Sequence, residues 1–457
     1  MTKKLTLGIL QTMSPYGFIG AAWRNPDNAS VDYLDLDYWT DMAKELDEAG
    51  FDFLFFADSF GYPSIDGEVV DAALRNAVNI PMADPFPVIA AIAAVTNNLG
   101  VVVTGSTLFE PPPALARRFS TLDHFTKGRV GWNVVTGVGY AASSRLFGQE
   151  QIPHNDRYAH ASEHLNVTYG LWEGSWEEDA LLVDREAGIY ADPKKVHQVS
   201  YSGKHFKSDG ILNVPPSPQR TPLVMQAGTS NEGRDFAAQN AEVVFLGGGS
   251  SQQTKDAIDD INRRAESFGR KPGAIKFMLG ATFIVAETDE AAQAAEEEML
   301  SYATREYAAA VYAFITGIDL LKYDQDKPIP VQQTNLGRSS LDRYKKAPAA
   351  DQKTVGEILE EWRSNGHNAK KFVGTPVAVA DQVEQVIAET GADGFLIQPY
   401  IVPGTHQDFA RLLMPILKER GMVPESPDGP TLRERVFGHG NPRLDETHPA
   451  AQYRKLG

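Results

Sequence analysis

The sequence predicts an α/β protein built as a closed (β/α)8 TIM barrel with several long insertions. Short apolar runs alternate with helical patterns along the chain, and this alternation is typical of parallel βαβ units. Eight of the runs qualify as strands followed by a helix, which is the number a closed barrel needs. An open doubly wound sheet is the alternative, but no G-x-G-x-x-G turn follows the first strand.

The first three predicted strands are separated by two helices. The first strand spans residues 5–10, and the helix that begins at Asp37 is stopped by Gly50. The second strand, residues 51–58, is a continuous apolar run of the kind found where both faces of a strand are covered. A helix over residues 87–97 then leads to the third strand, residues 100–106.

The fourth strand lies within "TKGRVGWNVVTG", residues 126–137, which follows a predicted helix over residues 112–125. A Lys-Gly turn leads there into β-branched and aromatic residues, as is typical of a strand. A helix is expected over residues 160–173. Four further runs complete the set of strands: Pro222–Gly228, Ala241–Gly247, Lys276–Ala286 and Gly394–Tyr400.

The chain is longer than its predicted barrel requires. An ordinary barrel of this kind needs about 250 residues, whereas this chain has 457. We therefore expect a single domain over residues 1–457 with insertions near 59–85, 180–220 and 302–372. The second insertion has the pattern of strands and turns, and the third that of a lid or wall, because long segments in a compact fold usually serve a function.

Composition excludes several classes of protein. A formal net charge of -17 argues against nucleic-acid binding, which requires a cationic surface. The absence of cysteine excludes disulfides, thiolate metal sites and cysteine nucleophiles. No stretch approaches the roughly 18 apolar residues of a membrane span, and the apolar run near the N-terminus is too short for a signal peptide. We expect a cytoplasmic protein without a membrane partner.

Polar residues stand at the ends of six predicted strands. The carboxyl ends of barrel strands converge on one mouth, where ligands bind. A set of neutral and acidic groups there, without a catalytic histidine pair or a metal cage, indicates a rim for a heterocycle, since an amide both donates to and accepts from a ring edge. Turn capping is the alternative role for each of these residues. They are Gln11, Asp58, Thr104, Asn133, Gln226 and Gln398.

Five stretches, in order along the chain, resemble the bacterial luciferase-like flavin monooxygenases. The resemblance is closest to the branch of nitrilotriacetate, dibenzothiophene-sulfone and long-chain alkane monooxygenases, and it extends from Trp23 to Pro399. It implies a barrel that binds FMN. The stretches are "FDFLFFAD", "GRVGWNVVTG", "HNDRY", "QAGTSNEGRDFAAQNAE" and "GADGFLIQP".

The resemblance also implies which residues contact FMN. Asp58, Thr104 and Asn133 would line the isoalloxazine ring, although a capping role for Asp58 and Asn133 stays open. His154 and Tyr158 would hold the ribityl-phosphate end with Arg157 nearby, and Ser230 would bind the phosphate. Ser230 precedes a predicted helix, whose N-terminus attracts anions, and a purely capping role is the alternative there as well.

The implied activity is that of a two-component monooxygenase. Reduced FMN, FMNH2, would come from a separate NAD(P)H:flavin reductase, and O2 is the co-substrate. The resulting peroxyflavin would oxidise a small organic substrate, one that contains a heteroatom or an aromatic ring. No residue stands out as catalytic, as expected where the flavin carries the chemistry. By analogy with relatives, we expect a homo-oligomer, either a dimer or a tetramer.

Two departures from the family pattern concern the substrate side. Val135-Thr136-Gly137, followed by Val138 and Gly139, stands after the Trp-Asn pair where "VTS" is usual, and the Trp23-Arg24 pair has no histidine before it. The first change could widen the space over the flavin. Five aromatic residues would suit a flat or apolar substrate, unless they serve only in packing: Tyr16, Phe18, Trp23, Phe60 and Tyr62.

Three alternatives to oxygenation remain. A relative in this branch cleaves riboflavin with the same reduced-flavin and O2 chemistry. The stretch "HASEH", His160 to His164, matches the H-x-x-E-H pattern of an inverted zincin and therefore a zinc hydrolase, although no third ligand is identifiable. A flavin-binding protein without catalytic activity is the third.

Overall fold

Eight parallel strands close into a barrel in the computed structural model of this protein, which describes residues 3–15, 17, 20–137, 139–228, 230–330, 338–345, 352–365 and 370–454. The strands form a closed ring. The strand that contains Val243 pairs with the strand that contains Lys276, and the first strand, at Thr6, pairs with the last, at Gly394. The predicted (β/α)8 fold is thus confirmed. The strands are β1 (Thr6–Gln11), β2 (Phe53–Phe56), β5 (Gly100–Ser106), β6 (Val130–Val135), β11 (Leu223–Gln226), β12 (Val243–Leu246), β13 (Lys276–Val285) and β15 (Gly394–Ile397).

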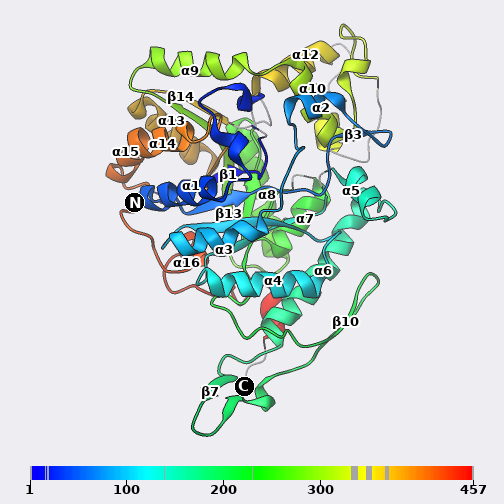
Figure 1. The fold of residues 1–457 in the computed structure, drawn as a ribbon, viewed down its shortest axis with the longest axis vertical. Helices are drawn as coiled ribbons and strands as arrows, with labels where there is room; N and C mark the ends of the chain where they lie inside the picture. The colour runs from blue at the N-terminus through cyan, green and yellow to red at the C-terminus, as the bar shows by residue number, and fades with distance from the viewer. Residues whose placement is uncertain are drawn as a thin grey trace.

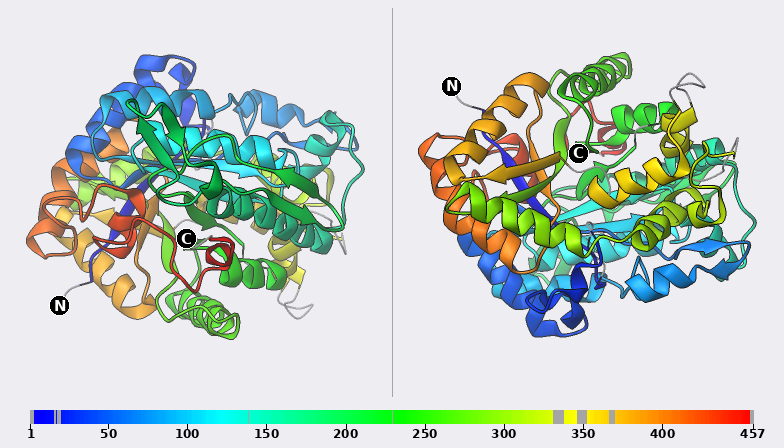
Figure 2. Two further views of the ribbon diagram at one scale, coloured as in Figure 1. Left: turned by 90° about the horizontal axis from the view of Figure 1, so that it is seen from below. Right: turned by 90° about the horizontal axis from the view of Figure 1, so that it is seen from above.

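Helices surround this barrel on its outer side (Figures 1 and 2). Their ends follow local capping rules: Asp35 accepts a hydrogen bond from the N–H of Asp37 at the start of α1, and Gly50, with φ of 91°, ends it. The larger apolar core lies between the strands and these helices. They are α1 (Leu36–Ala49), α3 (Phe86–Val95), α4 (Pro112–Phe125), α6 (His154–Gly174), α7 (Asn231–Asn240), α8 (Ser251–Ser267), α13 (Pro376–Thr390), α14 (Gly404–Asp408), a π-helical turn (Phe409–Leu413) and α15 (Met414–Glu419).

The amino ends of the strands are closed by the C-terminal helix α16 (Leu432–Phe437). Its Leu432 belongs to the apolar cluster that fills the barrel, and a Cβ on Gly100 would lie only 2.7 Å from its Cδ1. The neighbouring Arg433 is buried and forms an ion pair with Glu242, with Nε and Oε1 2.7 Å apart. In the described part of the chain, α16 therefore fills the barrel at its amino end.

Other segments gather at the carboxyl end of the barrel, on the right in Figure 1. Between β2 and α3 lie β3 (Ser64–Ile65), β4 (Glu68–Val69) and α2 (Asp71–Asn76); α5 (Tyr140–Leu146) follows β6. After β13 come α9 (Asp289–Ser301), which lies at the upper left of Figure 1, and then α10 (Arg305–Thr316), α11 (Arg338–Lys345) and α12 (Val355–Asn365). Nearly all of α10 is buried against α2 and α12, so it forms a packed wall.

One strand of the main sheet was not predicted from the sequence. β14 (Lys370–Gly374) pairs with the second half of β13, from Ala281 onward, and lies outside the closed barrel. β13 is ten residues long, so it extends beyond its barrel neighbours and leaves an edge that β14 covers.

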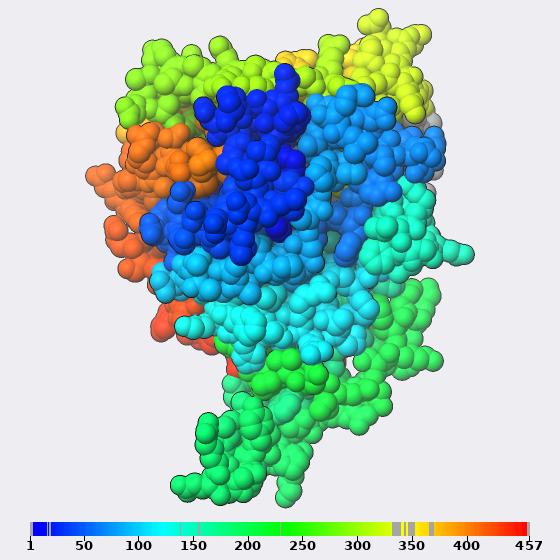
Figure 3. All heavy atoms as spheres, in the orientation of Figure 1, coloured from blue at the N-terminus to red at the C-terminus, as the bar shows by residue number. Residues whose placement is uncertain are grey.

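Two hairpins form an arm that projects from the lower end of the molecule (Figures 1 and 3). The first pairs β7 (Leu181–Asp184) with β8 (Ile189–Ala191), and the second pairs β9 (Val199–Ser202) with β10 (Lys207–Gly210). Short 3-10 turns occur at Ala22–Arg24, Ala29–Asp32, Pro193–Lys195, Leu320–Lys322 and Pro449–Tyr453. No helix in the described part of the chain is long and apolar enough to cross a membrane.

Candidate active site

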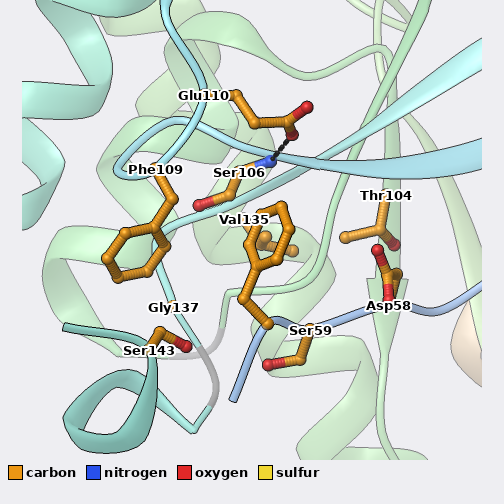
Figure 4. A pocket seen from close by; sticks show the side chains of 10 residues that line it. Asp58, Ser59, Thr104, Ser106, Phe109, Glu110, Val135, Gly137 and Ser143 are labelled. Carbon is orange, nitrogen blue, oxygen red and sulfur yellow. Dashed lines mark hydrogen bonds between the residues drawn. The ribbon is translucent and has the colours of Figure 1, made fainter. Parts of the chain in front are cut away.

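An open cavity lies at the carboxyl end of the barrel, between the loops that follow β2, β5 and β6. Figure 4 shows Asp58 and Thr104 on one side of it and Phe109 with Ser143 on the other. Two of the residues predicted from the sequence, Asp58 and Thr104, therefore share one cavity. Its lining comprises Asp58, Ser59, Phe60, Thr104, Ser106, Phe109, Glu110, Val135, Gly137 and Ser143.

Thr104 and Asn133 are direct neighbours on β5 and β6. The Asn133 side chain donates from Nδ2 to Thr104 Oγ1 at 2.9 Å, and Thr104 in turn donates to the carbonyl of Phe56 at 2.8 Å. Both side chains are buried. Within the described residues this is the only hydrogen bond of the Asn133 side chain, so its carbonyl oxygen and one N–H are left for a ligand.

The remaining strand-end amides are buried and carry atoms without partners. Gln11 Nε2, Gln226 Oε1 and Gln398 Oε1 have no hydrogen-bond partner in the described part of the chain. Gln398 occupies the space left by Gly280, where a Cβ would lie 3.3 Å from its Nε2. Buried polar atoms of this kind cost free energy unless a bound molecule or water satisfies them.

Asp58 lies two residues beyond the end of β2, because the strand stops at Phe56 and is shorter than predicted. Burial raises the pKa of its carboxyl group to about 7, and the negative charges of Asp84 and Glu110 act in the same direction against a hydrogen bond from the Ser59 N–H. Among the described residues, no cation forms an ion pair with Asp58. A carboxyl group in this setting changes its charge near neutral pH.

Glu110, a second carboxyl group of the cavity, was missed by the sequence analysis. It accepts from the Ser106 N–H at 2.9 Å and from Arg118 Nη1 at 2.5 Å. Burial raises its pKa. Its signal in the sequence was weak: Glu110 stands between the end of a strand and the prolines that begin the next helix.

Aromatic rings form one wall of the cavity. The rings of Phe109 and Phe147 are stacked with centroids 5.0 Å apart, and Phe60 contacts both of them edge-on. Tyr140 extends the wall behind Phe109, at 5.7 Å.

The aromatic residues predicted from the sequence contribute less to this wall. Of those that the structure describes, Phe60 lines the cavity, whereas Trp23 donates its Nε1 hydrogen to the carbonyl of Asn76 and Tyr62 is half-buried outside the lining. Tyr16 and Phe18 lie outside the described residues. The wall thus comes largely from residues that follow β5 and β6.

Three segments meet at the edge of this cavity through glycines. A Cβ on Gly61 would lie 2.2 Å from the carbonyl oxygen of Gly139, and one on Gly139 would lie 2.9 Å from Phe314 of α10. Gly139 also has φ of 63°, which favours glycine. The loop after β2, the loop after β6 and α10 therefore need both glycines. Within residues 135–139, where the sequence departs from the family pattern, Val138 lies outside the described residues.

A second cluster of polar side chains lies around the start of α7. Ser230 is the N-cap residue, and its Oγ accepts from the N–H of Gly233 at 3.1 Å. A Cβ on Gly233 would lie 2.8 Å from the hydroxyl oxygen of Tyr158 and 3.0 Å from Ser230 Oγ. The glycine thus leaves a small cradle between two hydroxyl groups at the positive end of a helix.

The other two residues predicted for the phosphate end of FMN, His154 and Arg157, belong to helix α6. Helix α6 begins at His154, earlier than predicted, after Pro153 at the N-cap position. Arg157 is buried, its guanidinium lies 3.8 Å from the ring centre of Tyr140, and its Nε donates to the carbonyl of Ile152 at 3.1 Å. These contacts connect Arg157 to the aromatic wall. The side chain of His154 lies outside the described residues.

The "HASEH" residues of α6 have structural contacts. Glu163 accepts from the backbone N–H groups of Lys204, His205 and Phe206 in the arm. His164 Nε2 bonds the carbonyl of Glu110 at 2.9 Å, and burial lowers the pKa of this histidine to about 4. Among the residues that the structure describes, no group of three or more His, Cys, Asp or Glu side chains could hold a metal ion.

Comparison with known proteins gives consistent matches over the whole chain. The dimethyl-sulfide monooxygenase of Hyphomicrobium sulfonivorans is 40% identical over 99% of this chain and 94% of its own length. The long-chain alkane monooxygenase of Geobacillus thermodenitrificans is 41% identical, covering 100% and 99%. A crystal structure of a riboflavin lyase with modified FMN and riboflavin superimposes with a TM-score of 0.94 at 40% identity, over 99% of this chain and 100% of the other.

The branch predicted from the sequence is confirmed. Nitrilotriacetate monooxygenase component A of Aminobacter aminovorans is 33% identical over 98% of this chain and 99% of its own length. Residues 18–394 match the family described as luciferase-like monooxygenase. The chain therefore belongs to the luciferase-like monooxygenases, a family of oxidoreductase enzymes.

Proposed function

We propose that this protein is the oxygenase of a two-component system, which uses FMNH2 and O2 to oxidise a small organic substrate. The reduced flavin would come from a separate NAD(P)H:flavin reductase, since component A of nitrilotriacetate monooxygenase is similar over nearly its whole length. The observation that carries the proposal is the pairing of two hydroxyl groups beside Gly233, at the start of α7, with unpartnered amides at the barrel mouth.

The cradle at α7 fits the phosphate end of FMN. Ser230 and Tyr158 offer hydroxyl groups that can donate to a phosphate oxygen, and the first turn of α7 adds free N–H groups. A dianion there needs no positive average field, because the local donors act at short range. His154 and Arg157 are proposed to assist, Arg157 chiefly by holding Tyr140 and the loop at Ile152 in place.

The barrel mouth fits the ring end of FMN. An isoalloxazine edge presents alternating donors and acceptors, and Asn133 has both to offer. Thr104 holds Asn133 in position by accepting its other N–H. Gln398 presents an unpartnered acceptor in the same barrel end. Asp58 is proposed to contact the ring as well.

When bound, reduced flavin supplies the electrons that activate O2. The protein's own residues orient the reactants and exclude water. Asp58 can hold a proton in the cavity at neutral pH, because burial raises its pKa to about 7. The aromatic wall and the packed helix α10 keep the space beside it apolar, which limits access of water.

Cleavage of riboflavin is the second candidate. The structural match to a riboflavin lyase, with a TM-score of 0.94, favours it specifically. The same cradle and mouth would then serve FMN, and riboflavin would enter as substrate.

The protein is further proposed to act in the cytoplasm as a homo-oligomer, a dimer or tetramer. Apolar side chains exposed on the projecting arm support association, since Leu182 is 49% and Tyr190 68% exposed. Light scattering on purified protein measures the mass directly.

A coupled assay tests the proposed function. The protein is supplied with a flavin reductase, NADH, FMN and O2, and offered dimethyl sulfide, hexadecane, dibenzothiophene sulfone and riboflavin in turn. We expect oxidation of at least one of them that requires both the reductase and this protein. Lumichrome from riboflavin would favour the lyase, and turnover with NADH alone, without FMN, would exclude both candidates.

A further inference from the structure

The rim of the cavity exposes two large aromatic side chains next to each other. Phe60 is 39% exposed and Phe147 40% exposed, and their rings are 5.0 Å apart. Phe109, which is stacked on Phe147, is buried beneath them. Neighbouring exposed rings at the edge of a cavity are typical of a surface that contacts an apolar molecule.

Negative groups, in contrast, are the only charged groups in this cavity among the residues that the structure describes. Asp58 and Glu110 line it, and its other polar side chains are hydroxyls. The two guanidinium groups nearby are already engaged. Arg118 is paired with Glu110, and Arg157 lies against the ring of Tyr140.

Among the residues that the structure describes, an anionic molecule would therefore meet no unpaired cation in the cavity lining. Charges of the same sign repel strongly where water is excluded, and a desolvated carboxylate requires a partner that this lining does not offer. Asp58 adds to this repulsion when its carboxyl group is ionised, because no ion pair within the described residues neutralises it. Specificity then follows from exclusion of the wrong charge as much as from contact with the right shape.

We infer that the substrate of this enzyme is uncharged and places a flat or apolar group against Phe60 and Phe109, and that polycarboxylates are excluded. The inference rests on the proposed function and narrows its substrate class. It separates this chain from its relative named for nitrilotriacetate, a tricarboxylate, and groups it with the relative named for uncharged dimethyl sulfide.

Two probes of equal shape and different charge test the inference. Enzyme saturated with FMN is dialysed at about pH 8 against 2-naphthamide or 2-naphthoate, which is ionised there. We expect the amide to bind at least about tenfold more tightly, the scale of one uncompensated charge contact. Equal or tighter binding of naphthoate, or saturable binding of neither probe, would overturn the inference.

A matched pair of variants isolates the charge. Phe60→Lys and Phe60→Met both remove an exposed ring, but only the first adds a cation to the lining. Relative to Phe60→Met, the lysine variant should shift the preference toward naphthoate by at least about fivefold. An identical preference in both would contradict a role for cavity charge. Thermal unfolding checks that each variant folds, and the wild-type ratio decides the question even if one does not.

Failure of the proposed function can be distinguished from failure of this inference. Binding of FMN is measured first, by dialysis without a probe. If FMN does not bind, the proposed function is wrong, and the preference between the two probes is still measured on the flavin-free protein.

Discussion

At the mouth of the barrel, the Asn133 side chain has one hydrogen bond within the described residues and keeps an oxygen and an N–H for a ligand. Asn133→Leu removes both while keeping the volume of the buried side chain. We expect a folded protein whose activity is at least about tenfold lower, the scale of one lost hydrogen bond. Circular dichroism and the coupled assay measure the two effects. Full activity in the folded variant would mean that the amide only closes the strand.

Asp58 gives a prediction for the dependence of stability on pH. Its pKa rises from 3.8 to about 7 on folding, so the folded state binds the proton more tightly than the unfolded state. This contribution to stability is present at low pH and is lost as pH rises toward 7. The Asp58→Asn variant has an amide at this position, which does not bind or release a proton in this pH range. Relative to wild type, the variant should therefore gain stability between about pH 4 and about pH 8, by roughly 1–4 kcal/mol at about 1.4 kcal/mol per pKa unit.

Urea unfolding at both pH values measures this gain. Asp84→Asn is the control, since it removes a neighbouring negative charge and leaves the Asp58 carboxyl group in place. A difference between wild type and Asp58→Asn that stays constant with pH would contradict the proposed protonation of Asp58.

Helix α7 is the element on which the phosphate site depends. Ser230→Ala and Tyr158→Phe should each weaken FMN binding by about 1.5–3 kcal/mol, because each removes a hydrogen bond to a charged group. Riboflavin, which lacks the phosphate, should lose much less. Isothermal titration with both flavins measures the difference, and an equal loss for the two would make these residues structural.

A neighbouring helix provides the control for this prediction. Ser250 caps α8 as Ser230 caps α7, with its side chain accepting from the N–H of Gln253. Ser250→Ala should cost about 1 kcal/mol of stability, as is typical of a lost cap. Its affinity for FMN should stay that of wild type.

The contact between Gly61 and Gly139 yields a prediction for the loops. Gly61→Ala would bring its Cβ against the Gly139 carbonyl, so the loops after β2 and β6 must separate. We expect a loss of about 1–3 kcal/mol in stability and reduced activity. Gly247→Ala, at a position with open space and ordinary φ, should be close to neutral. Equal effects in the two variants would show that the close contact is not required.

These elements also show what the sequence could predict. The eight strands were found because each is a short apolar run, and α4 was predicted with its observed ends. β14 was missed because it covers an edge that exists only once β13 extends past the barrel. The start of α6 was set six residues late, since "HNDRY" has no apolar periodicity and the Pro153 cap is the main local signal.

For the site, the sequence identified side chains at strand ends and missed those brought in by loops. Asp58 and Thr104 follow directly from the barrel rule, and the structure places both in one cavity. Phe109, Glu110 and Phe147 were missed because their position depends on how two loops fold over the mouth. The contact of Arg157 with Tyr140 is likewise tertiary, and no spacing along the chain indicates it.

For the molecule as a whole, closure of one end of the barrel decides where chemistry takes place. The C-terminal helix α16 fills the amino end, and its buried Arg433–Glu242 pair fixes it to β12. Arg433→Met would leave Glu242 buried without its cation, so we expect a loss of about 3–5 kcal/mol in unfolding free energy. Denaturant unfolding measures it, and a change below about 1 kcal/mol would mean that the pair does not hold the end closed.

In the proposed function, electrons reach O2 through reduced FMN bound to this protein. A single-turnover experiment with isotopic oxygen tests it most directly. Protein loaded with chemically reduced FMN, without NADH or reductase, is mixed with ¹⁸O₂ and the substrate identified by the coupled assay. We predict one ¹⁸O atom in the product, formed in an amount limited by the reduced FMN supplied. Product formed under strict anaerobiosis, or product whose new oxygen comes from water, would contradict the account.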